Sequence, residues 1–266
     1  MSRRPWTRFI LPTYTGLVIA YLFVPIAVMI AFGFNATSSK LNTRWQGFTL
    51  KWYRNLFDLP DLTDALRNSV TIAVLSAAIA TALGTMIGMA LARGRFRGRG
   101  SVDLLLFAAI SAPEIVLGAA LLSLFITLGI PRGFVTILIA HVMFSIGFVA
   151  VTVRARLVGF DDSVVEAARD LGAGAWTAFR TVTFPLIYPG ILAGGLLAFA
   201  LSIDDYIITS FNSGQTLTFP LWVFGSSRVG VPPQVNVMGT LIFAVGVAAA
   251  VANSVTLRRS RPRPPK

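Results

Sequence analysis

Six long apolar runs constrain the fold of this 266-residue chain more than any other feature of its sequence. A helix must present about 20 apolar residues to cross the hydrocarbon layer of a membrane. Backbone polar groups find no water in this layer, so spanning segments are helices or closed barrels. The uncharged run 76–92 lacks the alternating pattern of barrel strands, which excludes a barrel. We therefore predict an all-α integral membrane protein with six transmembrane helices, at residues 9–34, 69–92, 104–129, 134–153, 189–211 and 235–257.

The net charge of +12 is unevenly distributed along the chain. With the N-terminus inside, 16 of the 23 lysine and arginine residues fall in inner tails and loops, at 1–8, 93–99, 154–180 and 258–266. This is the positive-inside bias of membrane proteins, so we predict that both termini are cytoplasmic and that the basic residues contact membrane lipid rather than nucleic acid. The chain divides into a basic cytoplasmic tail (1–8), a six-span domain (9–257) and a basic disordered C-terminal tail (258–266).

Residue types that carry out catalysis are scarce. The sequence has no cysteine and a single histidine, His141, and it lacks the GxxxxGK[ST] loop that binds the phosphates of ATP. No cluster has the spacing of a Ser-His-Asp triad or a metal site. A membrane enzyme is therefore disfavoured, we expect no cofactor in this chain, and the energy for active transport must come from a partner.

A polar stretch at residues 160–189 separates the fourth and fifth apolar runs, and its composition predicts a contact surface for another protein. A helix at 164–171 has one apolar side, and its alanines keep its profile low. Gly172 is expected to end this helix, because glycine adopts a left-handed backbone without steric cost. Pro185 and Pro189 mark the return to the membrane. Such a helix can press into a groove on a partner; the alternative is an ordinary amphipathic loop.

Three acidic residues, Glu114, Asp204 and Asp205, are predicted well inside the spans, where a charge is costly unless it is paired or hydrated. No lysine or arginine is predicted at that depth, so the counter-charge comes from a companion subunit, from water or from a cationic substrate. Tyr206 and Trp222 add aromatic rings that attract ammonium groups. The alternative is that these carboxyls are neutral and hydrogen-bonded to helix backbones.

Local sequence rules add expectations about these residues. Pro113 is expected to kink the third span beside Glu114, because proline removes a backbone donor. On a continuous fifth helix, Asp204 and Asp205 would point about 100° apart, so one faces a cavity and the other a neighbouring helix, and the sequence leaves open which. His141 is expected to be a hydrogen-bonded packing residue, with a contact to Glu114 as the alternative.

The polar stretch also resembles a known motif. Residues 166–189 (EAARDLGAGAWTAFRTVTFPLIYP) are similar to the EAA loop of ATP-binding-cassette (ABC) importer permeases. The matching positions are Glu166, Ala167, Ala168, Gly172, Ala173, Phe179, Val182 and Pro185. The resemblance implies a type I, MetI-like permease fold in which this coupling loop contacts a cytoplasmic ATPase that holds ATP and Mg. The same loop disfavours an ion channel.

A narrower resemblance runs over residues 68–241. Four segments of the chain are similar to the permeases of spermidine/putrescine importers. These segments are 111–116, 202–211 (SIDDYIITSF), 218–221 and 227–233. This resemblance implies a multi-pass protein of the bacterial inner membrane that pairs with a second, homologous permease, two copies of an ATPase and an extracytoplasmic polyamine-binding protein.

The polyamine resemblance also implies roles for single residues. The acidic residues on the translocation path of the family correspond to Glu114, Asp204 and Asp205, and its coupling carboxylate corresponds to Glu166. The binding protein is expected to deliver substrate to the outer loops 35–67 and 212–234. Because the stretch after the outer-loop proline is less polar than in the family, an importer permease for another small solute, such as a different cation, a metal chelate or thiamine, is the alternative.

Overall fold

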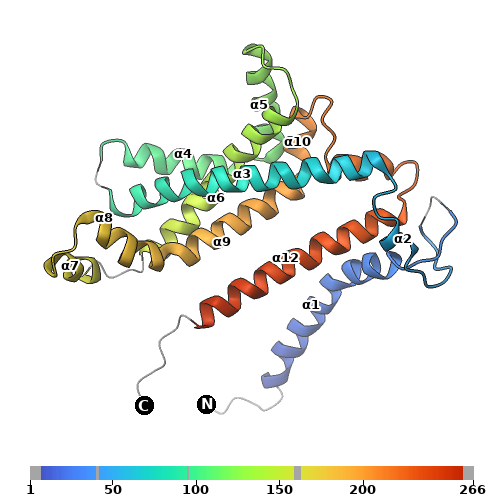
Figure 1. The fold of residues 1–266 in the computed structure, drawn as a ribbon, viewed down its shortest axis with the longest axis horizontal. Coiled ribbons are helices and arrows are strands. Elements are labelled where there is room, and N and C mark those ends of the chain that lie inside the picture. The colour runs from blue at the N-terminus through green and yellow to red at the C-terminus, as the bar shows by residue number, and fades with distance from the viewer. Residues whose placement is uncertain (1–6, 40–41, 95, 159–162, 260–266) are drawn as a thin grey trace. The chain divides into compact units, whose positions relative to one another are not determined.

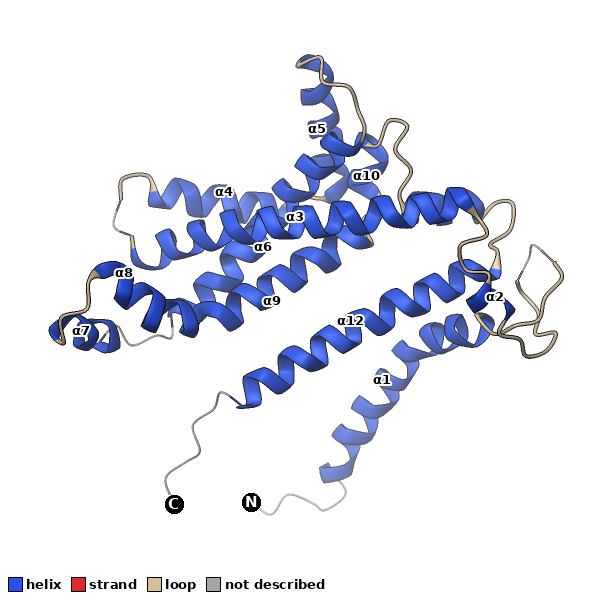
Figure 2. Cartoon of the chain, viewed as in Figure 1, coloured by secondary structure: helices blue, strands red, loops and turns tan. Residues whose placement is uncertain are grey.

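The computed structural model describes residues 7–39, 42–94, 96–158 and 163–259. Most of the two predicted tails, 1–6 and 260–266, and the start of the coupling loop, 160–162, lie outside these residues. The described chain is helical and contains no strand, as Figure 2 shows, which confirms the predicted all-α class.

The helices follow one another in the order shown in Figure 1. They are α1 (Thr7–Phe32), α2 (Lys51–Arg54), α3 (Pro60–Arg93), α4 (Arg99–Ser111), α5 (Glu114–Thr127), α6 (Phe134–Val158), α7 (Ser163–Asp170), α8 (Ala175–Ala178), the π-helical turn η1 (Phe179–Thr183), α9 (Phe184–Ile203), α10 (Ile207–Asn212), α11 (Phe219–Ser226) and α12 (Pro233–Arg259). The chain forms two compact units. The first contains Met1–Pro60 and Val223–Ala249, and the second contains Asp61–Trp222 and Ala250–Lys266.

The six predicted spans correspond to helices that are long and apolar enough to cross a membrane. Five are single helical segments, and the sixth is counted when the bent pair α4 and α5 is taken as one span. The five are Phe9–Phe32, Pro60–Arg93, Phe134–Val158, Ala175–Ile203 and Pro233–Ala252. Proline at the first position of a helix is tolerated, because that N–H has no partner within the helix, and this explains why α3 begins at Pro60, nine residues before the predicted start.

The third predicted span is broken rather than kinked. Helices α4 and α5 meet at an angle of 109°, with Ala112 and Pro113 between them. Ala112 is extended, at φ −68° and ψ 133°, because the residue before a proline is driven out of the helical region. The break places Glu114 at the first position of α5 instead of the middle of a helix.

The prediction of a continuous fifth helix at 189–211 is wrong in two respects: the helix begins before residue 189, and it is interrupted before residue 211. Helix α9 begins at Phe184 with Pro185 in its first turn, passes through Pro189 and ends at Ile203. Residues 204–206 are not helical, and α10 follows them. The helix stops here because an aspartate side chain accepts hydrogen bonds from the first N–H groups of α10, which competes with continuation of α9.

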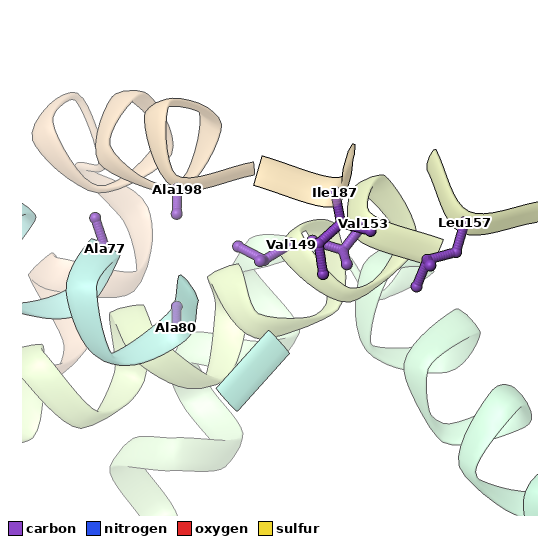
Figure 3. Packing of buried hydrophobic residues seen from close by; sticks show 7 residues of the cluster. All are labelled: Ala77, Ala80, Val149, Val153, Leu157, Ile187 and Ala198. Carbon is purple, nitrogen blue, oxygen red and sulfur yellow. The ribbon is translucent and has the colours of Figure 1, made fainter. Parts of the chain in front are cut away.

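The core of the second unit lies where α6 packs on α9 and α3. Its buried side chains are all aliphatic, as Figure 3 shows, and they are Ala77, Ala80, Val149, Val153, Leu157, Ile187 and Ala198. A Cβ on Gly84 would lie 2.7 Å from the Cβ of Val149, and one on Gly88 would lie 2.6 Å from the carbonyl oxygen of Ala150. These two glycines therefore bring α3 close to α6 within the chain.

The first unit contains α1, most of α12 and the segment after α1. Phe23 and Phe243 make an edge contact at 6.4 Å between α1 and α12. Asn35 is fully buried and holds the segment through its side chain, which donates to Asn42 Oδ1 and to the Arg44 carbonyl oxygen, each at 2.7 Å. This predicted outer segment is thus an ordered, hydrogen-bonded structure.

Candidate functional site

Two helix breaks lie close together in the second unit. One is the α4–α5 break at Pro113, and the other is the α9–α10 break at residues 204–206. Helix α10 packs beside α5, as Figure 1 shows, and a Cβ on Gly118 would lie 2.8 Å from the ring of Phe211. Non-helical backbone at membrane depth is tolerated only where protein buries it or water reaches it, so paired breaks of this kind mark a candidate pathway.

The breaks bring two exposed carboxylates together. Glu114 and Asp204 are both exposed at the adjoining breaks, and the Glu114 carboxyl is within electrostatic range of both Asp205 and Asp204. Asp204 follows the C-terminal end of α9, where the unpaired carbonyl groups carry partial negative charge, whereas Glu114 is the first residue of α5 and lies at the positive end of that helix. The two breaks therefore expose two carboxylates in different helix-end environments.

Asp205 has different surroundings from its neighbour Asp204. The residue is 8% exposed, and its carboxylate accepts three hydrogen bonds. Oδ2 accepts from the backbone N–H and from the hydroxyl of Thr209, each at 2.7 Å, and His141 Nε2 lies 3.2 Å from Oδ2 and 2.9 Å from the Thr209 hydroxyl oxygen. Oδ1 accepts from the backbone N–H of Ile208 at 3.3 Å. Asp205 thus caps the start of α10 and ties it to α6.

The hydrogen bonds continue from His141 into a buried chain. His141 Nδ1 lies 2.6 Å from the Ser202 hydroxyl, which lies 2.9 Å from the Ser76 hydroxyl. If Ser76 donates to Ser202 and Ser202 donates to Nδ1, then Nε2–H donates to the Thr209 hydroxyl oxygen, and that hydroxyl donates to Asp205 Oδ2. The network joins α3, α6, α9 and α10.

These contacts resolve what the sequence left open. His141 pairs with Asp205 and not with Glu114, and Asp205 is the inward-facing member of the aspartate pair. Ser76, Ser202 and Thr209 were not singled out from the sequence. An aspartate just before a helix start is a recognised capping signal, but nothing in the sequence connects it to a histidine 64 residues earlier.

Of the two aromatic residues predicted to contact the substrate, Tyr206 lies next to the carboxylates and Trp222 lies in another helix, α11. Tyr206 is half-buried within the α9–α10 break, next to Asp205. Trp222 is half-buried in α11, and no contact in the described ranges joins its ring to the three acidic residues. Its contribution to substrate binding remains a prediction.

The coupling loop forms the helix that its sequence predicts. Helix α7 ends at Asp170, two residues before Gly172, whose φ is +88°, and the N–H groups of Gly172 and Ala173 bond to the carbonyl oxygens of Arg169 and Ala168 at 2.9 and 3.0 Å. This is the Schellman arrangement that closes a helix. The predicted helix end at Gly172 is confirmed.

The apolar side of this loop is uncovered. No residue of α7 is buried, and the exposed fractions of Leu171 and Trp176 are 90% and 71%. Glu166 and Ala167 are exposed as well, and Ala168 is half-buried. The loop continues through α8 and η1 into α9, which ends at Ile203, directly before Asp204.

Comparison with known proteins places the chain in a class of membrane transport protein. A solved bacterial ABC transporter for the acidic polysaccharide alginate has a similar chain, with a TM-score of 0.65 and 16% identity over 98% of this chain and 100% of that chain. Residues 84–258 match the family of binding-protein-dependent transport system inner membrane components, and the chain belongs to this family. It is thus a multi-pass inner-membrane transport component with an ABC importer permease fold.

Two relatives are more similar in sequence. The chain is 41% identical over 242 residues to the spermidine/putrescine transport system permease protein PotC of Escherichia coli, which covers 91% of each chain. It is 40% identical over 270 residues to the putrescine transport system permease protein PotI of Escherichia coli, which covers 98% of this chain and 94% of PotI.

Proposed function

We propose that this chain is a permease subunit of an ATP-driven importer that carries spermidine or putrescine across the bacterial inner membrane. The observation that carries the proposal is the pair of exposed carboxylates, Glu114 and Asp204, at two adjoining helix breaks. No lysine or arginine occurs in residues 100–131 or 181–227, which contain both breaks. The names of the two relatives support a polyamine as the cargo.

The chemistry of a polyamine fits this surface. Its ammonium groups are separated by methylene chains, so two carboxylates can each attract one group while the apolar helix faces contact the methylenes. A carboxylate at membrane depth without a fixed basic partner is costly, and a cationic cargo lowers that cost only while it passes. A site of this kind binds its cargo without trapping it.

The energy would come from partner subunits. We propose that two copies of a cytoplasmic ATPase, which hold ATP and Mg, contact α7 through Glu166, Ala167, Ala168 and the exposed Leu171. A second, homologous permease would complete the pathway, and a polyamine-binding protein would deliver cargo to the outer loops. The positive-inside bias supports a cytoplasmic position for α7 and both termini.

Movement would pass from the ATPase along connected helices. Closure of the ATPase pair displaces α7, and η1 transmits the displacement to α9, in which Pro185 occupies the first turn. Helix α9 packs along α6 and ends at Asp204, so its tilt moves the acidic surface between the two sides of the membrane.

Uptake by the reconstituted complex tests this function. Proteoliposomes that contain the permease and its partners, with ATP on the ATPase side, should accumulate radiolabelled putrescine or spermidine. Glu114→Gln and Asp204→Asn should each lower uptake more than tenfold, whereas the control Asp58→Asn, at an exposed turn outside the spans, should not. Uptake that is insensitive to both substitutions would refute the assignment, and competition by thiamine or a metal chelate would favour another solute.

A further inference from the structure

The two adjacent aspartates have opposite environments. Asp204 is exposed at the break, whereas 92% of the surface of Asp205 is buried and its side chain faces α6 and α10. A carboxylate offers about four lone-pair positions to hydrogen-bond donors. Three donors bond to Asp205, namely the backbone N–H groups of Ile208 and Thr209 and the Thr209 hydroxyl, and His141 Nε2 lies 3.2 Å from Oδ2, so protein groups surround the carboxylate.

The bonds of Asp205 also hold a helix that is too short to be stable alone. Helix α10 has six residues, and isolated helices shorter than about 12 residues are marginal even for favourable sequences. Its fixed position comes from packing of Ile208 in a buried cluster with Leu121, Phe125 and Ala140, and from the cap that Asp205 provides. His141 fixes the cap to α6, and Ser202 fixes His141 to α9.

The cap has an electrostatic consequence for the adjoining surface. The start of a helix carries partial positive charge, and the start of α10 faces the same break as Asp204. The carboxylate of Asp205 neutralises this charge at α10, and Glu114, in the first turn of α5, does the same for the start of that helix. Without the cap, the start of α10 would repel a cation.

We propose that Asp205 and His141 form a positioning pair that sets the shape of the α9–α10 break and aims Asp204, and that Asp205 does not contact the cargo. This proposal rests on the proposed function, in which Asp204 and Glu114 face a cationic cargo. The two aspartates, adjacent in sequence, therefore have separate roles: one binds, and the other holds the binding residue in place through His141 and Ser202.

A double-mutant cycle on the purified complex tests the pair without cargo. Asp205→Asn and His141→Gln should each lower the melting temperature, and the double variant should lose clearly less than the sum, because both remove the same interaction. The matched control is Asp204→Asn combined with His141→Gln, whose effects should add. Additive effects in the Asp205 cycle would overturn the pairing.

Lengthening each aspartate by one methylene tests which of them meets the cargo. Asp204→Glu keeps a carboxylate at an open surface and should lower polyamine uptake by about threefold at most. Asp205→Glu must fit an extra methylene among three hydrogen-bond donors and the His141 ring, and should lower uptake at least tenfold further. Equal uptake by the two variants would contradict the proposal. If the wild-type complex transports no polyamine, the proposed function fails, but the melting cycle still decides the pairing.

Discussion

Substitution of Gly84 by alanine probes the packing that brings α3 against α6. The added Cβ would lie 2.7 Å from Val149 Cβ, 2.8 Å from Val149 Cγ1 and 2.9 Å from the carbonyl oxygen of Ile146. Two of these atoms belong to a stiff β-branched side chain and one to the backbone, so the helices must separate. Overpacking costs about 1–3 kcal/mol, and the three short contacts place Gly84 near the upper end of that range.

Helix propensity offsets part of this cost. Alanine is favoured over glycine inside a helix by about 1 kcal/mol, so the net destabilisation is about 2 kcal/mol. For a chain of this size that corresponds to a fall in melting temperature of roughly 4–8 °C. The assay is thermal unfolding of the detergent-purified complex, with Gly246→Ala as the control, since a Cβ at Gly246 meets nothing within 4 Å.

A second substitution identifies the contact that causes the loss. Val149→Ala removes the Cγ1 atom near the new methyl group, so the Gly84→Ala and Val149→Ala double variant should lose less than the sum of the single variants. If Gly84→Ala is as stable as Gly246→Ala, or if the double variant shows no coupling, the close approach of α3 to α6 described above is refuted.

Three further substitutions test other parts of the structure. Leu171→Asp, at a side chain that is 90% exposed, should leave the permease folded but weaken co-purification of the ATPase at least tenfold, because burying a leucine contributes about 1.5–3 kcal/mol, whereas Val229→Asp should not. Ser202→Ala removes the hydroxyl between two buried partners and should cost about 1–3 kcal/mol of stability, measured as a lower melting temperature. Arg154→Ala breaks the Asp103–Arg154 ion pair, whose side chains are about one-third exposed, and should lower the stability of the protein by less than about 1 kcal/mol. A larger loss would show that this ion pair, rather than apolar packing, joins α4 to α6.

The sequence by itself determined the features that depend on local rules. Apolar run length predicts the spans, because the thickness of the hydrocarbon layer sets how many residues a helix needs. Glycine and proline chemistry predicts the end of α7 at Gly172 and a disruption at Pro113, because these residues restrict or free the backbone at their own position. The same apolar pattern predicts that the polar stretch 160–189 lies between two spans and that Glu114, Asp204 and Asp205 lie within spans.

Tertiary structure alone decided how those residues are used. The histidine that holds Asp205 lies on another helix, and the two serines that extend the network are 126 residues apart, so no local pattern connects them. The break at Asp204 arises because Asp205 finds donors in α10 and on His141, which a continuous helix would not supply. Burial of one aspartate and exposure of the next therefore depend on the packing of α10 against α5 and α6, which is a long-range property of the fold.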